Sequence, residues 1–308
     1  MDFSNYLFRP HMCGLIMAGV PKLMTEKNKL RLVELLERQN GVSKPLTDNM
    51  VIELAKLIEQ RDSKIELTDG AKKTLDDIVR SNYFGRRSKI ETKQMTKGLV
   101  KEDESITLLT DYTNKMYFKN TQRKQNEFFD GECDINKSIV TDIKTSWDWS
   151  TFPVTGSLPS IYEWQTTCYI DLFECDGGQV AYCLVDTPPS LILRELRYVM
   201  KDSDFLRYNE DLGDVEIIEE FIEPIVDEVK RHLFTKKGLD AFIDFCAGNF
   251  PIDPIWFKDF QEVDKTKRVR IFDVPKDETK ISQVKEMIKL ARVYMTESLI
   301  TQKENGTI

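Results

Sequence analysis

The sequence predicts an α/β fold in which helices pack against a sheet of short strands, because two kinds of hydrophobic periodicity alternate along the middle of the chain. Helical segments repeat their apolar residues about every 3.6 positions, whereas strand segments are rich in β-branched and aromatic residues. The predicted elements are a helix over 96–114, strands over 115–120, 127–135 and 138–146, a helix over 160–173 and a strand over 179–187. Pro188 and Pro189 end the last strand, because proline lacks the backbone donor that a sheet needs.

Helical additions flank this core on both sides. Between Thr25 and Val79, apolar residues at helical spacing predict three helices separated by glycine and proline. In the C-terminal part, the sequence predicts helices over 191–200 and 215–234, and Pro224 interrupts the second of them. A strand over 268–274 and an amphipathic helix over 281–295 are predicted to follow. We therefore divide the chain into a helical N-terminal part (1–95), a central core (96–190) and a mainly helical C-terminal elaboration (191–308), packed as one domain.

The composition is that of an ordinary globular protein and excludes several classes. Of the 308 residues, 41% are hydrophobic and 31% are charged. No apolar stretch reaches the roughly 20 residues that a membrane-spanning helix needs, so we expect a soluble, intracellular protein with no membrane partner. The six cysteines show no CxxC spacing, which favours reduced, buried thiols over a zinc or iron–sulfur site.

The net charge of −8 argues against a surface that grips nucleic acid everywhere, because phosphate binding requires concentrated Lys and Arg. A local basic groove is compatible with this charge. The candidate contributors are Arg86, Arg87, Arg123, Lys124, Lys265, Lys267, Arg268 and Arg270, each of which alone is typical of a solvated surface. His232 lies on a predicted helix without a nearby partner in the sequence, which favours a surface position.

An Asp-x-Lys motif on the third predicted strand, together with an earlier aspartate, carries the chemistry. Asp134 ends one strand, while Asp142 and Lys144 stand two residues apart on the next, so their side chains point to the same face of the sheet. Magnesium prefers oxygen ligands and keeps several waters, so two carboxylates and the backbone carbonyl of Ile143 suffice to bind it. A bound water would be acidified, and Lys144 would stabilise negative charge on a phosphate. The pattern predicts metal-assisted hydrolysis of a phosphodiester.

Such a tripeptide alone is weak support, because in most proteins it is only surface charge. Its context is stronger, since a glutamate precedes it on a helix, and Gln165 and Tyr169 lie four residues apart on one face of the following helix. This arrangement resembles the PD-(D/E)XK nuclease superfamily and, within it, the phage-type recombination exonucleases similar to lambda exonuclease (the YqaJ-like viral recombinase family). The resemblance covers residues 8–187 and 265–294 and implies a restriction-endonuclease-like core.

The resemblance implies a role for each residue of the motif. The implied metal ligands are Asp134, Asp142 and the carbonyl of Ile143, and the implied catalytic residues are Lys144, Gln165 and Glu102. Glu102 resembles the glutamate of the first core helix, with Glu104 as the alternative. Gln165 matches the glutamine of the family's QxxxY helix, which contacts the scissile region or orders the lysine.

Five residues are candidates for contact with DNA. The segment FRPHMCGLIM resembles the family's N-terminal segment, in which an arginine and a serine bind the 5′ phosphate. Arg9 matches the arginine, whereas His11 stands at the serine position, where an imidazole could also donate to a phosphate. Tyr169 could contact DNA or simply pack in the core. Trp147 and Trp149, which follow the Asp-x-Lys strand, could stack on unpaired bases or pack against their own domain.

The activity that the resemblance implies is a Mg²⁺-dependent exonuclease, with Mn²⁺ as a substitute, that digests linear double-stranded DNA from 5′ to 3′. The product would be a 3′ single-stranded tail for recombination by a single-strand annealing protein. Relatives form rings around DNA, which implies a homo-oligomer, a trimer, whose channel alone needs positive charge. The resemblance also implies a phage-encoded protein in the cytoplasm of a bacterial host. The alternatives are a structure-specific or restriction-like endonuclease on the same fold, and a non-catalytic DNA-binding or assembly protein.

Overall fold

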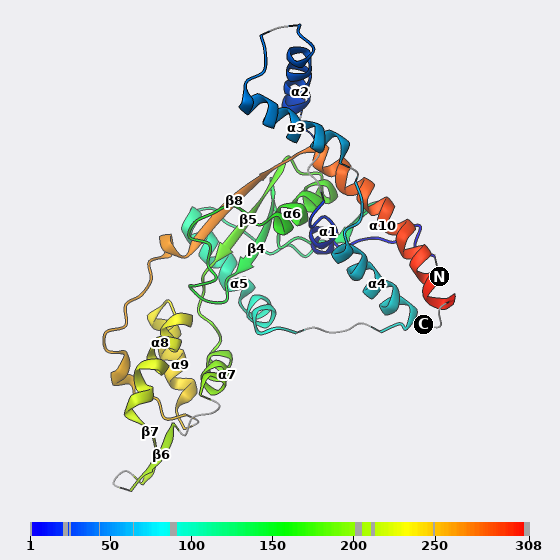
Figure 1. Cartoon of the computed structure of the whole chain (residues 1–308). Coiled ribbons are helices and arrows are strands. Elements are labelled where there is room, and N and C mark those ends of the chain that lie inside the picture. The colour runs from blue at the N-terminus through cyan, green and yellow to red at the C-terminus, as the bar shows by residue number, and fades with distance from the viewer. Residues whose placement is uncertain are drawn as a thin grey trace.

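The computed structural model describes residues 2–20, 24, 26–42, 44–63, 65–86, 91–200, 205–210, 213–248 and 250–304. Its helices are α1 (Pro10–Ile16), α2 (Glu26–Gln39), α3 (Asp48–Asp62), α4 (Asp69–Tyr83), α5 (Lys93–Thr113), α6 (Ser160–Phe173), α7 (Pro189–Val199), α8 (Ile222–His232), α9 (Lys236–Cys246) and α10 (Glu278–Glu304). Its strands are β1 (Lys124–Gln125), β2 (Asp130–Gly131), β3 (Ile135–Asn136), β4 (Val140–Thr145), β5 (Gly177–Cys183), β6 (Leu206–Asn209), β7 (Asp214–Ile217) and β8 (Val269–Pro275). Short 3₁₀ turns cover Glu219–Phe221, Pro254–Phe257 and Lys265–Lys267. The architecture is mixed α/β, which confirms the predicted fold class (Figure 1).

The central sheet has the strand order β3-β4-β5-β8. Strands β4 and β5 are parallel, whereas β3 pairs with β4 and β8 pairs with β5 in antiparallel orientation. Every residue of β5 is buried, because helices cover both faces of this inner strand. β3 pairs with only two residues of β4, Val140 and Thr141. Beyond Thr141, this edge of β4 has no strand partner within the described part of the chain. Side chains can therefore approach the backbone of β4 there.

Two helices enclose the sheet. On one face α5 packs Ile106 in the same apolar cluster as Ile143 of β4. On the other face α6 forms the crossover between the parallel strands β4 and β5, a connection that parallel strands require. A Cβ atom at Gly178 would approach Thr166 Cγ2 to 2.6 Å, so this glycine allows α6 to lie close to the sheet. The side chains of β4 that face α6 are therefore held against that helix.

On the outside of the molecule, α1 and α10 pack against α6, and α4 packs against α1 and α10 (Figure 1). A Cβ atom at Gly14 of α1 would lie 2.4 Å from the carbonyl oxygen of Ile161, so α1 touches the start of α6 backbone to backbone. At the opposite end of the sheet, α7, α8 and α9 form a lobe with its own apolar cluster. Asp186, just after β5, accepts hydrogen bonds from the backbone amides of Phe234 and Thr235 and thereby ties this lobe to the sheet.

The structure confirms most of the predicted elements. The helix over 160–173 has the predicted bounds, and β4, β5 and β8 overlap their predicted strands. The three N-terminal helices are present as α2, α3 and α4. No helix among the described residues combines the length and apolarity needed to cross a membrane. All six cysteines are free and buried, as predicted.

Other predicted elements are wrong. The segment 115–120 forms no strand, because α5 ends at Asn114 in a left-handed conformation (φ 54°) and the chain then runs irregularly along the sheet edge. The segment 127–135 contributes only the two-residue strand β2 and the start of β3. In the predicted helix over 215–234, the first residues form β7, and Pro224 lies in the first turn of α8, where its missing N–H costs nothing. Helices α1 and α9 and strand β6 were not predicted.

Candidate active site

The two aspartates and the lysine of the motif come together at the open edge of β4. Asp142 and Lys144 both point toward α6, whereas Ile143 between them points toward α5. Asp134 directly precedes β3, and its Oδ2 accepts a hydrogen bond of 2.6 Å from the backbone N–H of Ile143. This bond replaces the strand pairing that β3 is too short to supply, and it brings Asp134 next to Asp142.

Gln165 on α6 joins the carboxylate and the ammonium of the motif. Lys144 Nζ lies 2.7 Å from Asp142 Oδ2, and Gln165 Nε2 donates a hydrogen bond of 2.8 Å to Asp142 Oδ1. Lys144 Nζ also donates to Gln165 Oε1 at 3.2 Å and lies 4.5 Å from the ring centroid of Tyr162. Gln165 therefore contacts both charged side chains, and the ring of Tyr162 lies against the ammonium.

The electrostatics of the cluster are those of two buried acids that share one cation. Burial, followed by repulsion from Asp142, raises the pKa of Asp134 to about 7. Burial also raises the pKa of Asp142, although the attraction of Lys144 opposes this change. Burial acts to lower the pKa of Lys144, but the attraction of Asp142 outweighs it, so that this pKa is raised. With both aspartates ionised, the cluster has an excess negative charge that a bound cation would neutralise.

The donor atoms fit a divalent metal ion. Asp142 Oδ2 is buried and accepts no well-formed hydrogen bond, although it makes the ion pair with Lys144. The N–H and C=O of one strand residue point to the same side, so the Ile143 carbonyl faces the side on which its N–H meets Asp134. Among the described residues, no three His, Cys, Asp or Glu side chains form a group that could hold a metal. A cation would therefore rest on two carboxylates and this carbonyl, an oxygen set that suits Mg²⁺.

Glu102, rather than the alternative Glu104, is the glutamate of α5 that faces the cluster. Its side chain is 19% exposed and lies 3.2 Å from Lys119 Nζ. After burial and the neighbouring aspartate, repulsion from Glu102 also raises the pKa of Asp134, as expected of close carboxylates. Glu104 is 55% exposed, pairs with Lys101 and lines a separate cavity of about 660 Å³. Of the two alternatives, Glu102 is therefore the one that lies near the cluster, and its catalytic role stays a prediction.

The N-terminal segment lies beside the cluster. Arg9 is exposed directly before α1, and His11 is exposed two residues further on, in the first turn of the helix. Burial, and then the positive charges of Arg9 and Lys144, lowers the pKa of His11, so this imidazole stands close to the ammonium of the motif. The close contact of Gly14 with α6 holds α1 in this position. Arg9 and His11, the predicted pair of DNA-contacting residues, thus lie beside the cluster.

Tyr169, the second residue of the QxxxY pattern, belongs to the core. It is 7% exposed, its ring packs against Phe173 with centroids 6.4 Å apart, and a Cβ at Gly131 would approach Tyr169 Cε1 to 3.3 Å. Burial, and then the nearby aspartates, raises the pKa of its hydroxyl. The alternative of core packing therefore holds, and Tyr169 offers DNA almost no surface.

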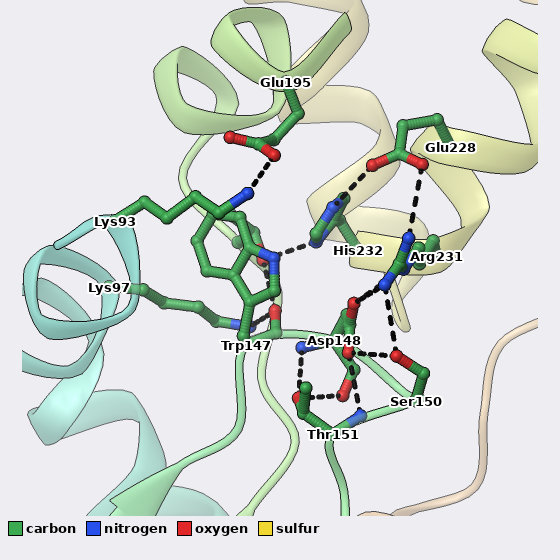
Figure 2. A network of polar contacts seen from close by, with 11 residues as sticks. Lys93, Lys97, Trp147, Asp148, Ser150, Thr151, Glu195, Glu228, Arg231 and His232 are labelled. Atoms are coloured by element: carbon green, nitrogen blue, oxygen red, sulfur yellow. Dashed lines mark hydrogen bonds and ion pairs between the residues drawn. The ribbon is translucent and has the colours of Figure 1, made fainter. Parts of the chain in front are cut away.

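The two tryptophans after β4 differ in exposure. Trp147 is 6% exposed; Lys93 Nζ lies 5.0 Å from its ring centroid, and the ring of His232 packs against it with centroids 4.9 Å apart (Figure 2). Lys97 Nζ donates a hydrogen bond of 2.9 Å to the Trp147 carbonyl. The predicted stacking of Trp147 on DNA bases is therefore wrong for this structure, because both sides of the ring are packed. Trp149 is 60% exposed and keeps its predicted role open.

A buried polar network, which we call the loop network, surrounds Trp147. It consists of Lys97, Trp147, Asp148, Glu228, Arg231 and His232 (Figure 2). His232 is fully buried, and its Nε2 lies 3.1 Å from Glu228 Oε1. The predicted surface position of His232 is wrong, because helix α8 turns this side chain toward the loop after β4. The loop network thus joins α5, that loop and α8.

Two site residues were missed by sequence reasoning. Tyr162 lies three residues before Gln165 on the same face of α6, so helical spacing could have indicated its place beside the lysine. Lys119, which pairs with Glu102, carries no such signal, because it lies on an irregular segment whose position depends on tertiary contacts.

The central sheet thus carries the Asp-Asp-Lys-Gln cluster at one edge of a mixed α/β fold. Among solved structures, the chain is similar to a phage-related exonuclease from Haemophilus somnus 129PT, with 22% identity over 90% of this chain and 99% of that chain and a TM-score of 0.53. It is also similar to the alkaline exonuclease LHK-Exo from Laribacter hongkongensis, with 8% identity over 79% of this chain and 88% of that chain and a TM-score of 0.45. The same enzyme in complex with dAMP gives 8% identity, coverage of 78% and 87% and a TM-score of 0.44.

No family model matches the sequence, and no curated protein sequence matches it. The similarity to the Haemophilus somnus structure extends over nearly the whole of both chains. The chain therefore shares the fold of that phage-related exonuclease, which agrees with the predicted similarity to phage-type exonucleases at the level of the fold.

Proposed function

We propose that this chain is a Mg²⁺-dependent exonuclease that degrades linear double-stranded DNA. The observation that carries the proposal is the buried cluster of Asp134, Asp142 and Lys144, in which Gln165 hydrogen-bonds to the second carboxylate and to the ammonium. Two adjacent carboxylates attract a divalent cation, and a fixed ammonium beside them can meet a phosphate. The fold shared with a phage-related exonuclease supports the same function.

Each residue of the cluster has a separate proposed role. Asp134, Asp142 and the Ile143 carbonyl would hold the cation, which supplies positive charge beside the phosphate and activates water. Lys144 would donate to the phosphate oxygen on which negative charge develops. Gln165 would keep Asp142 and Lys144 in the geometry that the reaction needs, because it already bonds to both.

The finer features of the proposed activity rest partly on exposed residues beside the cluster and partly on the family resemblance. We propose digestion from 5′ to 3′, with Arg9 and His11 at the 5′ phosphate, because both residues are exposed beside the active site. Trp149 is an exposed ring that could stack on an unpaired base. A homotrimeric ring would gather the basic residues of three copies around DNA although each chain carries a net charge of −8. The 3′ tails would then serve a single-strand annealing protein, and Mn²⁺ would replace Mg²⁺.

One degradation assay tests the proposal. The substrates are an end-labelled linear duplex and a closed circular plasmid of the same sequence, each incubated with Mg²⁺, with Mn²⁺ or with a chelator. We expect loss of the linear duplex with either metal, no loss with the chelator, and an intact circle. A label at the 5′ end should be released before a label at the 3′ end of the same strand.

Other outcomes would replace the proposal. Cleavage of the closed circle would favour the endonuclease alternative. A folded chain that binds the duplex but hydrolyses neither substrate would favour a non-catalytic binding protein. The matched control is Glu104→Gln, because this residue lies on the same helix as Glu102 but faces away from the cluster, and full activity is expected of it.

A further inference from the structure

The strand register places Lys144 at one end of a row of residues that crosses three strands. Lys144 of β4 lies opposite Tyr182 of β5, which in turn lies opposite Arg270 of β8. The three side chains share the face that α6 covers, because Ala181 and Cys183, on either side of Tyr182, belong to the apolar cluster on the α5 side. Neighbouring strands are about 4.8 Å apart, so the row extends roughly 10 Å from the active-site cluster.

The hydroxyl of Tyr182 has no hydrogen bond within the described part of the chain. The side chain is 9% exposed, and its ring packs against those of Tyr162 and Phe272 with centroids 6.2 and 5.9 Å away. A buried tyrosine hydroxyl usually has a partner. This one is not among the fully enclosed polar atoms, so solvent reaches it. Burial, and then Tyr162 and Asp142, raises its pKa, so the hydroxyl stays protonated and can donate.

The first turn of α6 lies beside this tyrosine. The ring of Tyr162 lies against Tyr182 and against the Lys144 ammonium, and its hydroxyl likewise makes no hydrogen bond to any described residue. No described side chain caps α6, which begins after Pro159. The N-terminus of a helix has a partial positive charge and free amide donors, so it favours an anion. Two hydroxyl donors and a helix N-terminus therefore lie together without an acceptor.

Arg270 adds a positive charge at the far end of the row. Its Nη1 donates a hydrogen bond of 2.7 Å to the Val154 carbonyl, and its Nη2 donates one of 3.5 Å to the Gly156 carbonyl. A guanidinium has five N–H donors, so others remain for a ligand. No carboxylate of the described residues pairs with Arg270, and Glu163, the acid in the first turn of α6, is paired with Lys280. The surroundings of the two tyrosines therefore favour an anionic ligand.

We propose that Tyr162, Tyr182 and Arg270 form a subsite for the phosphate next to the scissile one in the same DNA strand. In the proposed reaction the scissile phosphate meets Lys144, where the row begins, so a continuous strand would carry its neighbouring phosphate to the tyrosine hydroxyls. Each hydroxyl would donate a charge-assisted hydrogen bond, and Arg270 would supply charge. Such contacts position a strand without reading its sequence. This inference rests on the proposed nuclease function and adds residues that hold the strand during cleavage.

The test removes the hydroxyls and the phosphate charge separately. The double variant Tyr162→Phe/Tyr182→Phe keeps both rings, so its thermal midpoint should equal that of the natural chain. The probe is a short linear duplex in which a neutral methylphosphonate replaces one phosphate at a time, at the first three linkages from either end. Binding is measured by fluorescence anisotropy with Ca²⁺ in place of Mg²⁺. We expect the double variant to bind the unmodified duplex at least about tenfold more weakly.

The decisive result is a loss of additivity. At one linkage, the methylphosphonate should weaken binding by the natural chain but not by the double variant, because the partners of that phosphate are already absent. This linkage should differ from the one at which Lys144→Met becomes insensitive. Arg270→Met should also weaken binding of the unmodified duplex and reduce the loss at the same linkage as the double variant. Tyr198→Phe, which removes an exposed hydroxyl on α7, is the matched control and should bind every duplex as the natural chain does.

Two outcomes would overturn the subsite while the proposed function stands. One is equal binding of the unmodified duplex by the natural chain and the double variant. The other is a methylphosphonate loss that is the same in both proteins at every linkage, which would mean that the rings pack or stack and the hydroxyls hold no phosphate. A natural chain that neither binds nor digests DNA would overturn the subsite and the proposed function together.

Discussion

The active-site cluster and the loop network are two buried polar clusters at opposite ends of one short stretch of chain, yet their aspartates behave in opposite ways. Burial acts to raise the pKa of Asp148, but hydrogen bonds from Ser150 and Thr151 outweigh it, so that this pKa is lowered. Burial raises the pKa of Asp134 and of Asp142, and hydrogen bonds do not compensate for it. The ionised form of Asp148 is thus stabilised by its partners, whereas burial destabilises the ionised forms of Asp134 and Asp142.

The number of partners explains the difference. Asp148 accepts hydrogen bonds from Ser150 Oγ, the Thr151 amide and Arg231 Nε at 2.6–2.9 Å, so its charge is balanced without any external group. In the active-site cluster, two carboxylates share a single ammonium, and one buried carboxylate oxygen lacks a hydrogen bond. A satisfied buried charge stabilises the fold, whereas an unsatisfied one keeps a place for a ligand. A buried aspartate with an unsatisfied oxygen is therefore the one to expect at a reacting site.

Asp142→Asn should give the largest effect on activity. The change removes one of two carboxylates from the proposed metal site, so we expect the rate of DNA degradation to fall at least about a thousandfold, which corresponds to about 4 kcal/mol in the activation barrier. The variant should remain folded, because Lys144 keeps its contact with Gln165. Thermal unfolding supplies a second measurement: Mg²⁺ should raise the midpoint of the natural chain but not that of the variant. Full activity with Mg²⁺ would exclude this aspartate as a ligand.

Lys144→Met should lower turnover by about a hundredfold to a thousandfold, because a fixed donor matters most when charge develops on the phosphate. The methionine keeps the length of the side chain and the contact with Tyr162 while it removes the charge. Saturation of the rate with Mg²⁺ should need no more metal than in the natural chain. A large loss of metal affinity with normal turnover at saturating Mg²⁺ would mean that this lysine shapes the metal site instead.

Asp148→Asn tests the role of the loop network in stability. The neutral amide loses the ion pair with Arg231 and weakens the bonds from Ser150 and Thr151, so the free energy of unfolding should fall by about 2 to 3 kcal/mol. The rate of degradation per folded molecule should stay unchanged, since this carboxylate is outside the active-site cluster. Urea unfolding and an assay well below the thermal midpoint measure the two quantities. A stable but inactive variant would show that the loop network belongs to the reaction.

The sequence predicted the active-site cluster better than the loop network, and the reason is the range of the contacts. Strand alternation sets the common face of Asp142 and Lys144, and helical spacing sets the place of Gln165, so local patterns were enough. The packing of Trp147 on His232 joins residues that lie far apart in the chain, and no local pattern carries it. Trp147, a candidate DNA contact in the sequence, and His232, predicted at the surface, are instead buried against each other.

The errors in the fold have the same origin. The segment 115–120 has the composition of a strand, but it finds no partner along the sheet edge and stays irregular. Strands β6 and β7 form an exposed two-stranded hairpin, and their sequences LRYN and DVEI alternate between apolar and polar residues. Each strand has only four residues, too few for this alternation to be distinguished from the helical pattern around it. The helix over 160–173 was predicted with its observed bounds, because Gly156 and Pro159 mark the loop before it, although it is buried on nearly all sides.

Lys97→Met should produce the smallest effect of the four variants. We expect it as a change in how the free energy of unfolding depends on pH. Lys97 is fully buried, and burial lowers its pKa from 10.5 to about 7, although the attraction of Asp186 and Asp148 opposes this change. Between these two values the unfolded chain holds a proton that the folded chain has released, so the free energy of unfolding rises with pH. From pH 7 to pH 9, the natural chain should gain about 2 kcal/mol relative to the variant in urea unfolding. If the free energy of unfolding changes equally with pH in the natural chain and in the variant, Lys97 keeps its proton in the folded state. The loop network would then balance the charge of Lys97 as fully as it does that of Asp148.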